Sequence, residues 1–163
     1  MSEWIVQTSN ARIIPAGTPD QIEQVRTLFR QYAEATGARE CFHGFAVEVA
    51  ELPGQYAPPT GRLLLAEVGC RAAGCVALRR LDDQTGEMKR LYVRPEFRGR
   101  KLGRQLSEAV LDEAARIGYR AMRLDTLPSM VAALALYEAM GFRSIPRYNE
   151  NPSAGVIYLE LKF

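Results

Sequence analysis

The feature of this chain that most constrains its fold is a junction. A β-type segment, residues 88–93, leads through a short basic loop into an amphipathic helix, residues 102–117. The first N–H groups of a helix have no partner within the helix, and the helix dipole adds partial positive charge at the same end. Gly103 lets the backbone come close to a bound group. The junction therefore predicts a binding site for an anion, and for a phosphate in particular.

Positive charge is concentrated at this junction. The net charge of the chain is only +2, yet seven Lys or Arg residues and one acid lie between Lys89 and Arg104. The small net charge gives no reason to expect a nucleic acid or a membrane as partner, and no aromatic platform alternates with the basic residues as single-stranded nucleic acid would require. The remaining alternative to an anion site is a solvated helix start.

The composition indicates one domain, residues 11–163, after an N-terminal tail, residues 1–10. The chain has 163 residues, of which 47% are hydrophobic and 25% charged, as in ordinary globular proteins. No apolar stretch reaches the roughly 18 residues that span a bilayer, and the first ten residues lack the pattern of a secretory signal. Cys41, Cys70, Cys75 and the single His43 have no metal-ligand spacing, so we expect no metal site and a cytoplasmic location.

The remaining elements follow from periodicity and from turn residues. A cap at Thr18, with Pro19 and Gln21 after it, predicts a helix that ends at Gly37. A helix is also expected over residues 45–52, a loop over 53–61, and a helix from Ser129 to Gly141. The expected strands are 12–14, 63–68, 75–81, 87–93, 122–125 and 156–161. This order predicts a mixed sheet with helices on its faces.

Two motifs lie on these elements. Arg98-Gly99-Arg100-Lys101-Leu102-Gly103 follows a strand, and Ala133-x-x-Leu136-Tyr137-x-x-x-Gly141-Phe142 lies on the later helix. With both in place, the chain resembles the GNAT superfamily of N-acetyltransferases from Ile13 onward, and most strongly over residues 87–142. Lys101 stands where the family usually has its first patterned glycine, and Met130 stands where many members have an asparagine that contacts the cofactor.

The resemblance implies an α+β (mixed α/β) fold with a central, mostly antiparallel β-sheet flanked by helices on both faces. It also implies acetyl-CoA as co-substrate, with its pyrophosphate held by N–H groups of residues 99–104 and its pantetheine arm paired like a further strand. For Lys101 we expect a negative φ and a solvent-exposed side chain. The expected cofactor-binding residues are Leu91, Tyr92, Val93, Arg98, Gly99, Arg100, Lys101, Leu102, Gly103 and Arg104.

Acetyl transfer to an amine needs a neutral nitrogen and a proton for the departing thiolate. At pH 7 an amine with a pKa of about 10.4 is deprotonated at a cost of about 4.6 kcal/mol. Glu87, at an acidic position that some family members use, is the expected base. The alternative is that Glu87 is a surface strand residue or forms a salt bridge to Lys89 or Arg79. Tyr137 is the expected general acid, and by resemblance its hydroxyl lies beside the cofactor sulfur. Its alternative is a core aromatic.

These residues predict an N-acetyltransferase that acetylates the primary amine of a small molecule by direct attack in a ternary complex. The acceptor pocket is expected between residues 41–60 and 147–158, where Arg39, Arg147 and Tyr148 could hold a carboxylate. The alternatives are a protein lysine or N-terminal acetyltransferase, a non-catalytic acyl-CoA-binding sensor, and a covalent route through Cys41 and His43. A homodimer that pairs the C-terminal strand is also expected.

Overall fold

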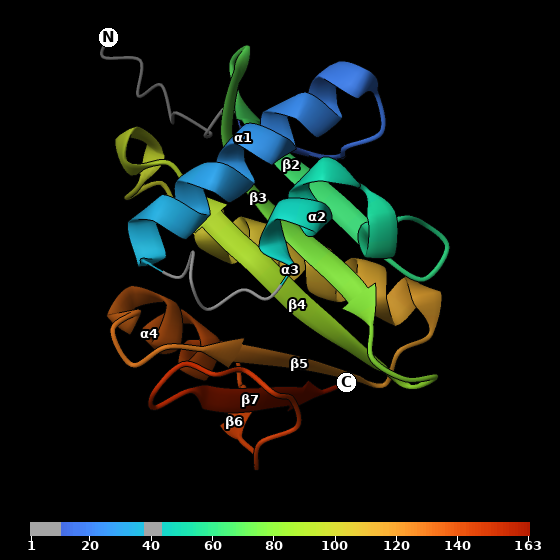
Figure 1. The fold of residues 1–163 in the computed structure, drawn as a ribbon, viewed down its shortest axis with the longest axis vertical. Helices are drawn as coiled ribbons and strands as arrows, with labels where there is room; N and C mark the ends of the chain where they lie inside the picture. Colours follow the sequence, from blue (N-terminus) through green and yellow to red (C-terminus); the bar gives the residue numbers. More distant parts are fainter. Residues whose placement is uncertain (1–10, 38–43) are drawn as a thin grey trace, which may run out of the picture.

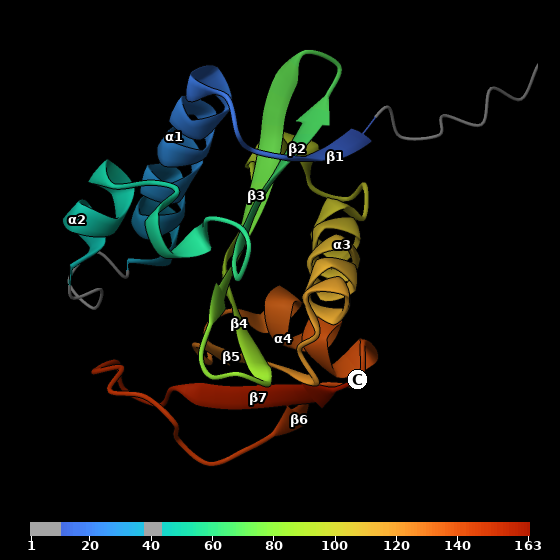
Figure 2. The same cartoon turned by 90° about the vertical axis from the view of Figure 1, so that its right-hand side faces the viewer.

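The computed structural model describes residues 11–37 and 44–163 as a seven-stranded mixed sheet with helices on both faces (Figures 1 and 2). The helices are α1 (Pro19–Thr36), α2 (Phe45–Ala50), α3 (Leu102–Ile117) and α4 (Val131–Ala139), with single 3₁₀ turns η2 (Gly54–Tyr56) and η3 (Pro95–Phe97). The strands are β1 (Ala11–Pro15), β2 (Arg62–Val68), β3 (Arg71–Arg80), β4 (Thr85–Val93), β5 (Ala121–Thr126), β6 (Arg143–Ser144) and β7 (Ile157–Lys162).

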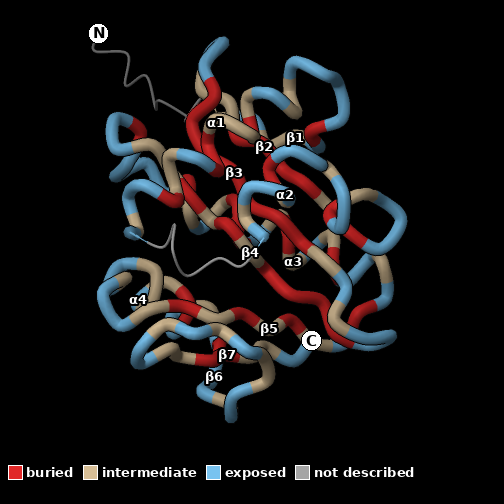
Figure 3. Tube along the Cα trace, viewed as in Figure 1, coloured by how far each residue is buried: buried red, intermediate tan, exposed pale blue. Residues whose placement is uncertain are grey.

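The sheet has the order β1-β2-β3-β4-β5-β7-β6, and all pairs are antiparallel except β4 with β5. Helices α1 and α2 cover one face, and α3 and α4 cover the other (Figure 2). Successive residues of β2 therefore enter different cores: Leu63 packs under α1, and Leu64 packs under α3. Burial on both faces explains why β2 and β3 contain nearly continuous apolar runs, residues 63–66 and 72–78 (Figure 3). The predicted fold class is confirmed.

The local signals for the helices are confirmed in detail. The Thr18 hydroxyl caps α1 by accepting a hydrogen bond from the Gln21 N–H, and the Gln21 side-chain oxygen accepts one from the Thr18 N–H. Gly37 ends the helix in the left-handed region, with φ 63°. The helix expected from Ser129 begins two residues later, at Val131, after the backbone of Met130 has closed a turn with Leu127.

The strand predictions missed β6, which has only two residues. Because β6 pairs with β7, β7 is not the edge strand of the sheet. We expected this C-terminal strand to pair across a dimer. In the structure β7 already pairs with β5 along its length and with β6 at Leu159 and Glu160, so it has a neighbouring strand on each side.

Strands β4 and β5 meet at one end and diverge toward the other (Figure 1). Their parallel pairing covers only three residue pairs, from Thr85 with Ala121 to Glu87 with Arg123. A bulge then turns β4, where Arg90 has a φ of 58° and the register with β3 shifts. Within the described ranges, no strand pairs with the β5-facing edge of β4 beyond Glu87. The divergence leaves a strand edge open in the middle of the sheet.

The loop between β4 and α3 has two residues in the left-handed region, Gly99 with φ 81° and Lys101 with φ 61°. The side chain of Lys101 is exposed, as expected, but the expectation of a negative φ is wrong. Lys101 is the residue that immediately precedes α3, and the chain has to turn sharply there to enter the helix. A lysine in this conformation costs about 1 kcal/mol relative to a relaxed backbone.

Replacing Lys101 by glycine should raise the free energy of unfolding by about 0.5–1 kcal/mol, because glycine adopts a positive φ without strain. Urea unfolding without added ligand measures the change. Lys101→Ala is the matched control, since it removes the same side chain but keeps the strain. Equal stability of the two variants would show that the backbone at this position carries no cost.

Gly74 is required by close packing between β3 and β4. A Cβ at this position would lie 2.5 Å from the Tyr92 carbonyl oxygen, and this neighbour is backbone that cannot rotate away. Gly74→Ala should therefore lower the free energy of unfolding by about 1–3 kcal/mol, measured by urea unfolding. Gly17→Ala is the control, since a Cβ there meets nothing within 4 Å. A loss no larger than that of the control would contradict the packing argument.

Candidate active site

A groove of about 590 Å³ lies where β4, the following loop, α1 and the start of α4 come together. Eight of the ten predicted cofactor-binding residues line this groove: Leu91, Tyr92, Val93, Arg98, Gly99, Lys101, Leu102 and Gly103. The side chains of the other two turn elsewhere. Arg100 lies over the Phe97 ring at 5.6 Å, and Arg104 pairs with Glu108 at 2.9 Å. Their backbones remain part of the loop.

The loop end of the groove suits an anion. The backbone N–H groups of residues 99–104 donate to no acceptor within the part of the chain that the structure describes. Gly103 has an ordinary helical φ, and a Cβ there would touch only Leu136, at a comfortable 3.7 Å. Packing within the protein therefore does not require glycine at this position, whereas a group bound closely to the helix start would.

The strand end of the groove suits an extended chain with amide groups. Tyr92 and Val93 pair with Cys75 and Gly74 of β3, whereas Leu91 lies in the bulge that precedes them. The other edge of this segment faces the gap left by β5. An open strand edge offers alternating N–H and carbonyl groups to a peptide-like partner. The groove thus joins an amide-binding edge to an anion-binding loop, as the pantetheine and pyrophosphate of a CoA ester require.

Several residues of this groove are not among those predicted from the sequence. Tyr32 and Thr36 reach it from α1, and Val131 and Leu136 reach it from α4. Tyr32 lies on the face of α1 that packs against the core, and the same side chain also lines the groove. Val131 is recognisable only from the structure, where this apolar residue is 70% exposed at the groove wall.

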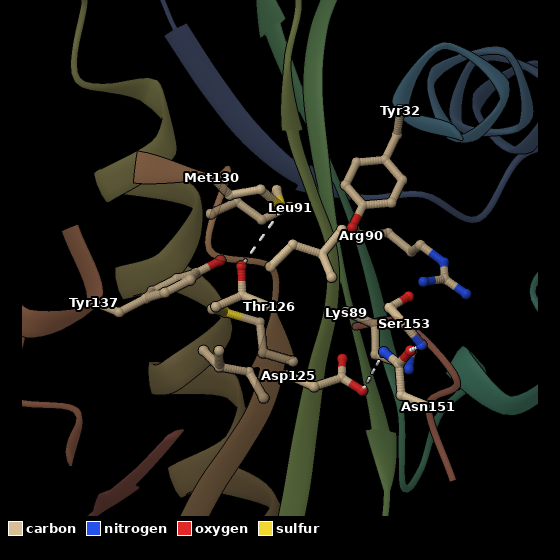
Figure 4. A pocket seen from close by; sticks show the side chains of 13 residues that line it. Tyr32, Lys89, Arg90, Leu91, Asp125, Thr126, Met130, Tyr137, Asn151 and Ser153 are labelled. Carbon is tan, nitrogen blue, oxygen red and sulfur yellow. Dashed lines mark hydrogen bonds between the residues drawn. The ribbon is translucent and has the colours of Figure 1, made fainter. Parts of the chain in front are cut away.

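A small cavity of about 30 Å³ adjoins the groove and contains Tyr137 (Figure 4). Tyr137 projects from α4 towards Leu91 of β4 and Thr126 of β5, at the point where the two strands separate. Burial raises the pKa of the Tyr137 hydroxyl, so this group keeps its proton at neutral pH. Thr126 Oγ1 donates to Met130 Sδ at 3.5 Å, so Met130 lies between the small cavity and the groove.

A third hollow of about 510 Å³, here called the acceptor cavity, lies between α2 and the loop of residues 149–152. These segments fall within the two regions expected to form the acceptor pocket. The acceptor cavity shares Lys89, Arg90, Asp125 and Asn151 with the small cavity. Groove, small cavity and acceptor cavity therefore form a path along the gap between β4 and β5.

Glu87, the expected base, lies beneath this path and is fully buried. Its Oε1 contacts Arg79 Nε at 2.7 Å and Lys89 Nζ at 3.4 Å, while its Oε2 accepts a hydrogen bond from the Tyr148 hydroxyl at 2.7 Å. The salt bridges that the sequence left open as an alternative are both present. Among the described residues, Glu87 does not line the groove, the small cavity or the acceptor cavity.

Two of the three residues expected to hold a carboxylate, Arg147 and Tyr148, do not line the acceptor cavity. Arg39 lies outside the described residues. Arg147 contacts the Asn149 carbonyl and Glu150, and Tyr148 binds Glu87, so neither lines the acceptor cavity. Burial and the neighbouring Glu87 raise the pKa of Tyr148.

Within the described residues, neither cysteine supports a covalent route. Cys75 is buried, its thiol donates to the Arg90 carbonyl at 3.4 Å, and burial raises its pKa. Cys70 is exposed on the turn between β2 and β3, and Cys41 and His43 lie outside the described residues.

Residues 11–37 and 44–163 contain no cluster of three metal-ligating side chains and no helix that could cross a membrane.

Comparison with known proteins agrees with this geometry. The profile of the Acetyltransferase (GNAT) family matches residues 22–142. An uncharacterised N-acetyltransferase of Schizosaccharomyces pombe is 35% identical over 97% of this chain and 98% of its own length. The N-acetylaspartate synthetase of Danio rerio is 34% identical over 60% of this chain and 36% of its own length.

The fold also has solved counterparts. The PaiA N-acetyltransferase of Thermoplasma acidophilum, solved in complex with coenzyme A, superposes with a TM-score of 0.72 over 94% of this chain and 99% of that one, at 17% identity. The family match, the full-length relative and the shared fold lead to one conclusion. This chain belongs to the GNAT family of N-acetyltransferases, which use acetyl-CoA as co-substrate.

Proposed function

We propose that this enzyme acetylates the primary amine of a small molecule by direct attack in a ternary complex with acetyl-CoA. The observation that carries the proposal is the acceptor cavity. Its volume of about 510 Å³ is typical of small-ligand sites, and it joins the cavity that holds Tyr137. A protein substrate would instead need an open groove for its flanking residues. The relative named N-acetylaspartate synthetase supports a small acceptor.

The reaction removes two protons from the acceptor nitrogen and supplies one proton to the departing sulfur. The acceptor ammonium first loses a proton, and the nitrogen lone pair then attacks the thioester carbonyl carbon. The C–N bond forms, the C–S bond breaks, and the amine gives up a second proton as the amide appears. The thiolate takes up one proton to become the thiol of CoA. The products are the N-acetyl amine, CoA and one released proton.

Tyr137 is the proposed donor of the proton to the thiolate. Its raised pKa keeps the hydroxyl protonated, and a thiol with an ordinary pKa of about 8.5 is the more acidic partner in the products. Proton transfer from the tyrosine to the thiolate is therefore unfavourable by itself, and it is completed when the proton released by the amine reprotonates the phenolate. The position of Tyr137 at the strand gap suits this role.

For Glu87 we propose an indirect role as base. Both carboxylate oxygens already have partners, so a proton from the amine reaches Glu87 only through Lys89, Tyr148 or water. Glu87 also fixes Lys89 and Arg79 at the floor of the acceptor cavity, since it contacts both of them. This second task needs no proton transfer.

The alternative of a non-catalytic acyl-CoA sensor rests on Lys101 and Met130, which depart from the family pattern. Calorimetry with acetyl-CoA, followed by thiol release with amino acids, polyamines, aminoglycosides and peptides, separates the two. We expect saturable binding and thiol release that depends on a small amine. Binding without release for any amine would favour the sensor, and intersecting initial-velocity lines would support the ternary complex over a covalent route.

Tyr137→Phe should lower kcat at least tenfold and leave the dissociation constant of acetyl-CoA nearly unchanged, because only the proton donor is removed. Stopped thiol-release assays and calorimetry measure the two quantities. Tyr119→Phe is the matched control: it removes a buried hydroxyl that donates to the Thr60 carbonyl, distant from the cavities. Full turnover by the Tyr137 variant would remove this residue from the mechanism.

We keep the homodimer and the cytoplasmic location as further proposals. The groove, the small cavity and the acceptor cavity are each lined by residues of one chain, so the proposed reaction requires no partner copy. Sedimentation velocity of the purified protein decides the oligomeric state.

A further inference from the structure

The floor of the acceptor cavity holds two cations that share one carboxylate. Arg79 and Lys89 both contact Oε1 of Glu87, and the other oxygen is occupied by Tyr148. Both cations line the acceptor cavity, and Lys89 also lines the small cavity next to Tyr137. Since one carboxylate neutralises only one of the two cations, this cluster leaves one positive charge facing the cavity.

The facing wall carries a negative charge. Asp125 lies near the end of β5 and lines both cavities. Its Oδ2 accepts the side-chain amides of Asn149, at 2.7 Å, and Asn151, at 3.3 Å (Figure 4 shows the bond from Asn151). Within the described residues, Oδ1 accepts no hydrogen bond and Asp125 forms no ion pair within 4 Å. One carboxylate oxygen is therefore left for a ligand.

The charge of Asp125 is stable at neutral pH. Burial alone would raise the pKa of its carboxyl group, but the charge of Lys89 and the hydrogen bonds from Asn149 and Asn151 outweigh this effect and lower it. Asp125 and Lys89 thus influence each other through the cavity, although they form no ion pair there.

The other charges of the cavity do not change this balance. Arg90 and Glu48 form a two-contact pair, with Nε–Oε2 at 2.9 Å and Nη2–Oε1 at 3.1 Å, so the pair adds no net charge, although Arg90 also contributes to the lowered pKa of Asp125. Glu51 and Glu150 lie exposed at the rim, where water and salt screen their charges, and Glu150 already pairs with Arg147. The inner cavity therefore has one uncompensated charge of each sign.

We propose that the acceptor is an amino acid, whose amine binds at Asp125 and whose carboxylate binds at Lys89. This inference rests on the proposed function and names its substrate class. An amino acid brings an ammonium and a carboxylate together in one small molecule, so it matches both charges at once. Because both residues also line the cavity of Tyr137, the bound amine lies next to the position where acetyl transfer takes place. Asp125 accepts a hydrogen bond from the amine and so aims its lone pair after deprotonation.

The competing acceptor is a polyamine, which would be drawn by Asp125 and the rim acids. It has no negative group for the cation cluster, so its binding would bury the charge of Lys89 beside another cation. The structure therefore favours the amino acid, and polyamines serve as a test.

The experiment compares amino acids with their amides and methyl esters, which keep the amine but lack the carboxylate, and with putrescine and spermidine. Thiol release from acetyl-CoA gives kcat and KM for each. We expect kcat/KM for the best amino acid to exceed that for its amide at least tenfold, mainly through KM. Equal or better use of amides, esters or polyamines would overturn the proposal.

Three variants assign the preference to residues. Lys89→Gln should reduce the acid-to-amide ratio towards one, and Lys89→Arg should restore part of it. Glu87 keeps Arg79 and Tyr148 in all of these variants, so the fold should persist. Asp125→Asn should raise KM for acid and amide alike, because both carry the amine. Arg143→Gln, an exposed cation on β6, is the charge-matched control and should leave the ratio unchanged. A ratio unaffected by Lys89→Gln would contradict the assignment.

Calorimetry of the same ligands with CoA-bound protein separates this inference from the proposed function. Amino acids that bind at least tenfold more tightly than their amides, without turnover, would support the binding site but overturn the small-molecule acetyltransferase. Turnover of amines without any preference for a carboxylate would leave the proposed function and overturn this inference.

Discussion

The site depends on the early separation of β4 from β5. Parallel pairing of the two strands ends after three residue pairs, and the bulge at Arg90 turns the rest of β4 away. If the pairing continued, the edge of Leu91–Val93 would be filled by β5 and the cavities between the strands would close. The open edge of β4 can instead form hydrogen bonds with water or with another chain of amides that takes the place of β5. We propose that the pantetheine arm of acetyl-CoA takes this place.

Local signals made most of the fold predictable. The capping box at Thr18, the glycine after α1 and the apolar spacing of α3 each act within a few residues of chain, so they can be read from the sequence. The loop between β4 and α3 was predictable for the same reason. The two-residue β6 was not, because its pairing with β7 depends on distant backbone and leaves no periodic pattern in two residues.

The acceptor side of the site was much less predictable. Glu87 was recognised, but its burial beneath Arg79, Lys89 and Tyr148 depends on three separate segments meeting in space. Asp125 was predicted only as a strand residue. The alternating pattern of β5 does not reveal that β4 no longer pairs with β5 at this position. Arg147 and Tyr148 carried suitable chemistry but point into other contacts. Charge in a sequence indicates what a pocket can hold only after the fold has shown which charges are already paired.

The departure at Lys101 illustrates how the site tolerates a change of side chain. An anion bound at the start of α3 is held by backbone N–H groups, and those of residues 99–104 have no acceptor among the described residues. The loop therefore needs a particular backbone path more than a particular side chain. Lysine can follow that path at a cost of about 1 kcal/mol, and its ammonium adds a charge that an anion favours. The same reasoning weakens the case for a sensor that has lost its chemistry, because the altered position leaves the cradle and the cavity of Tyr137 in place.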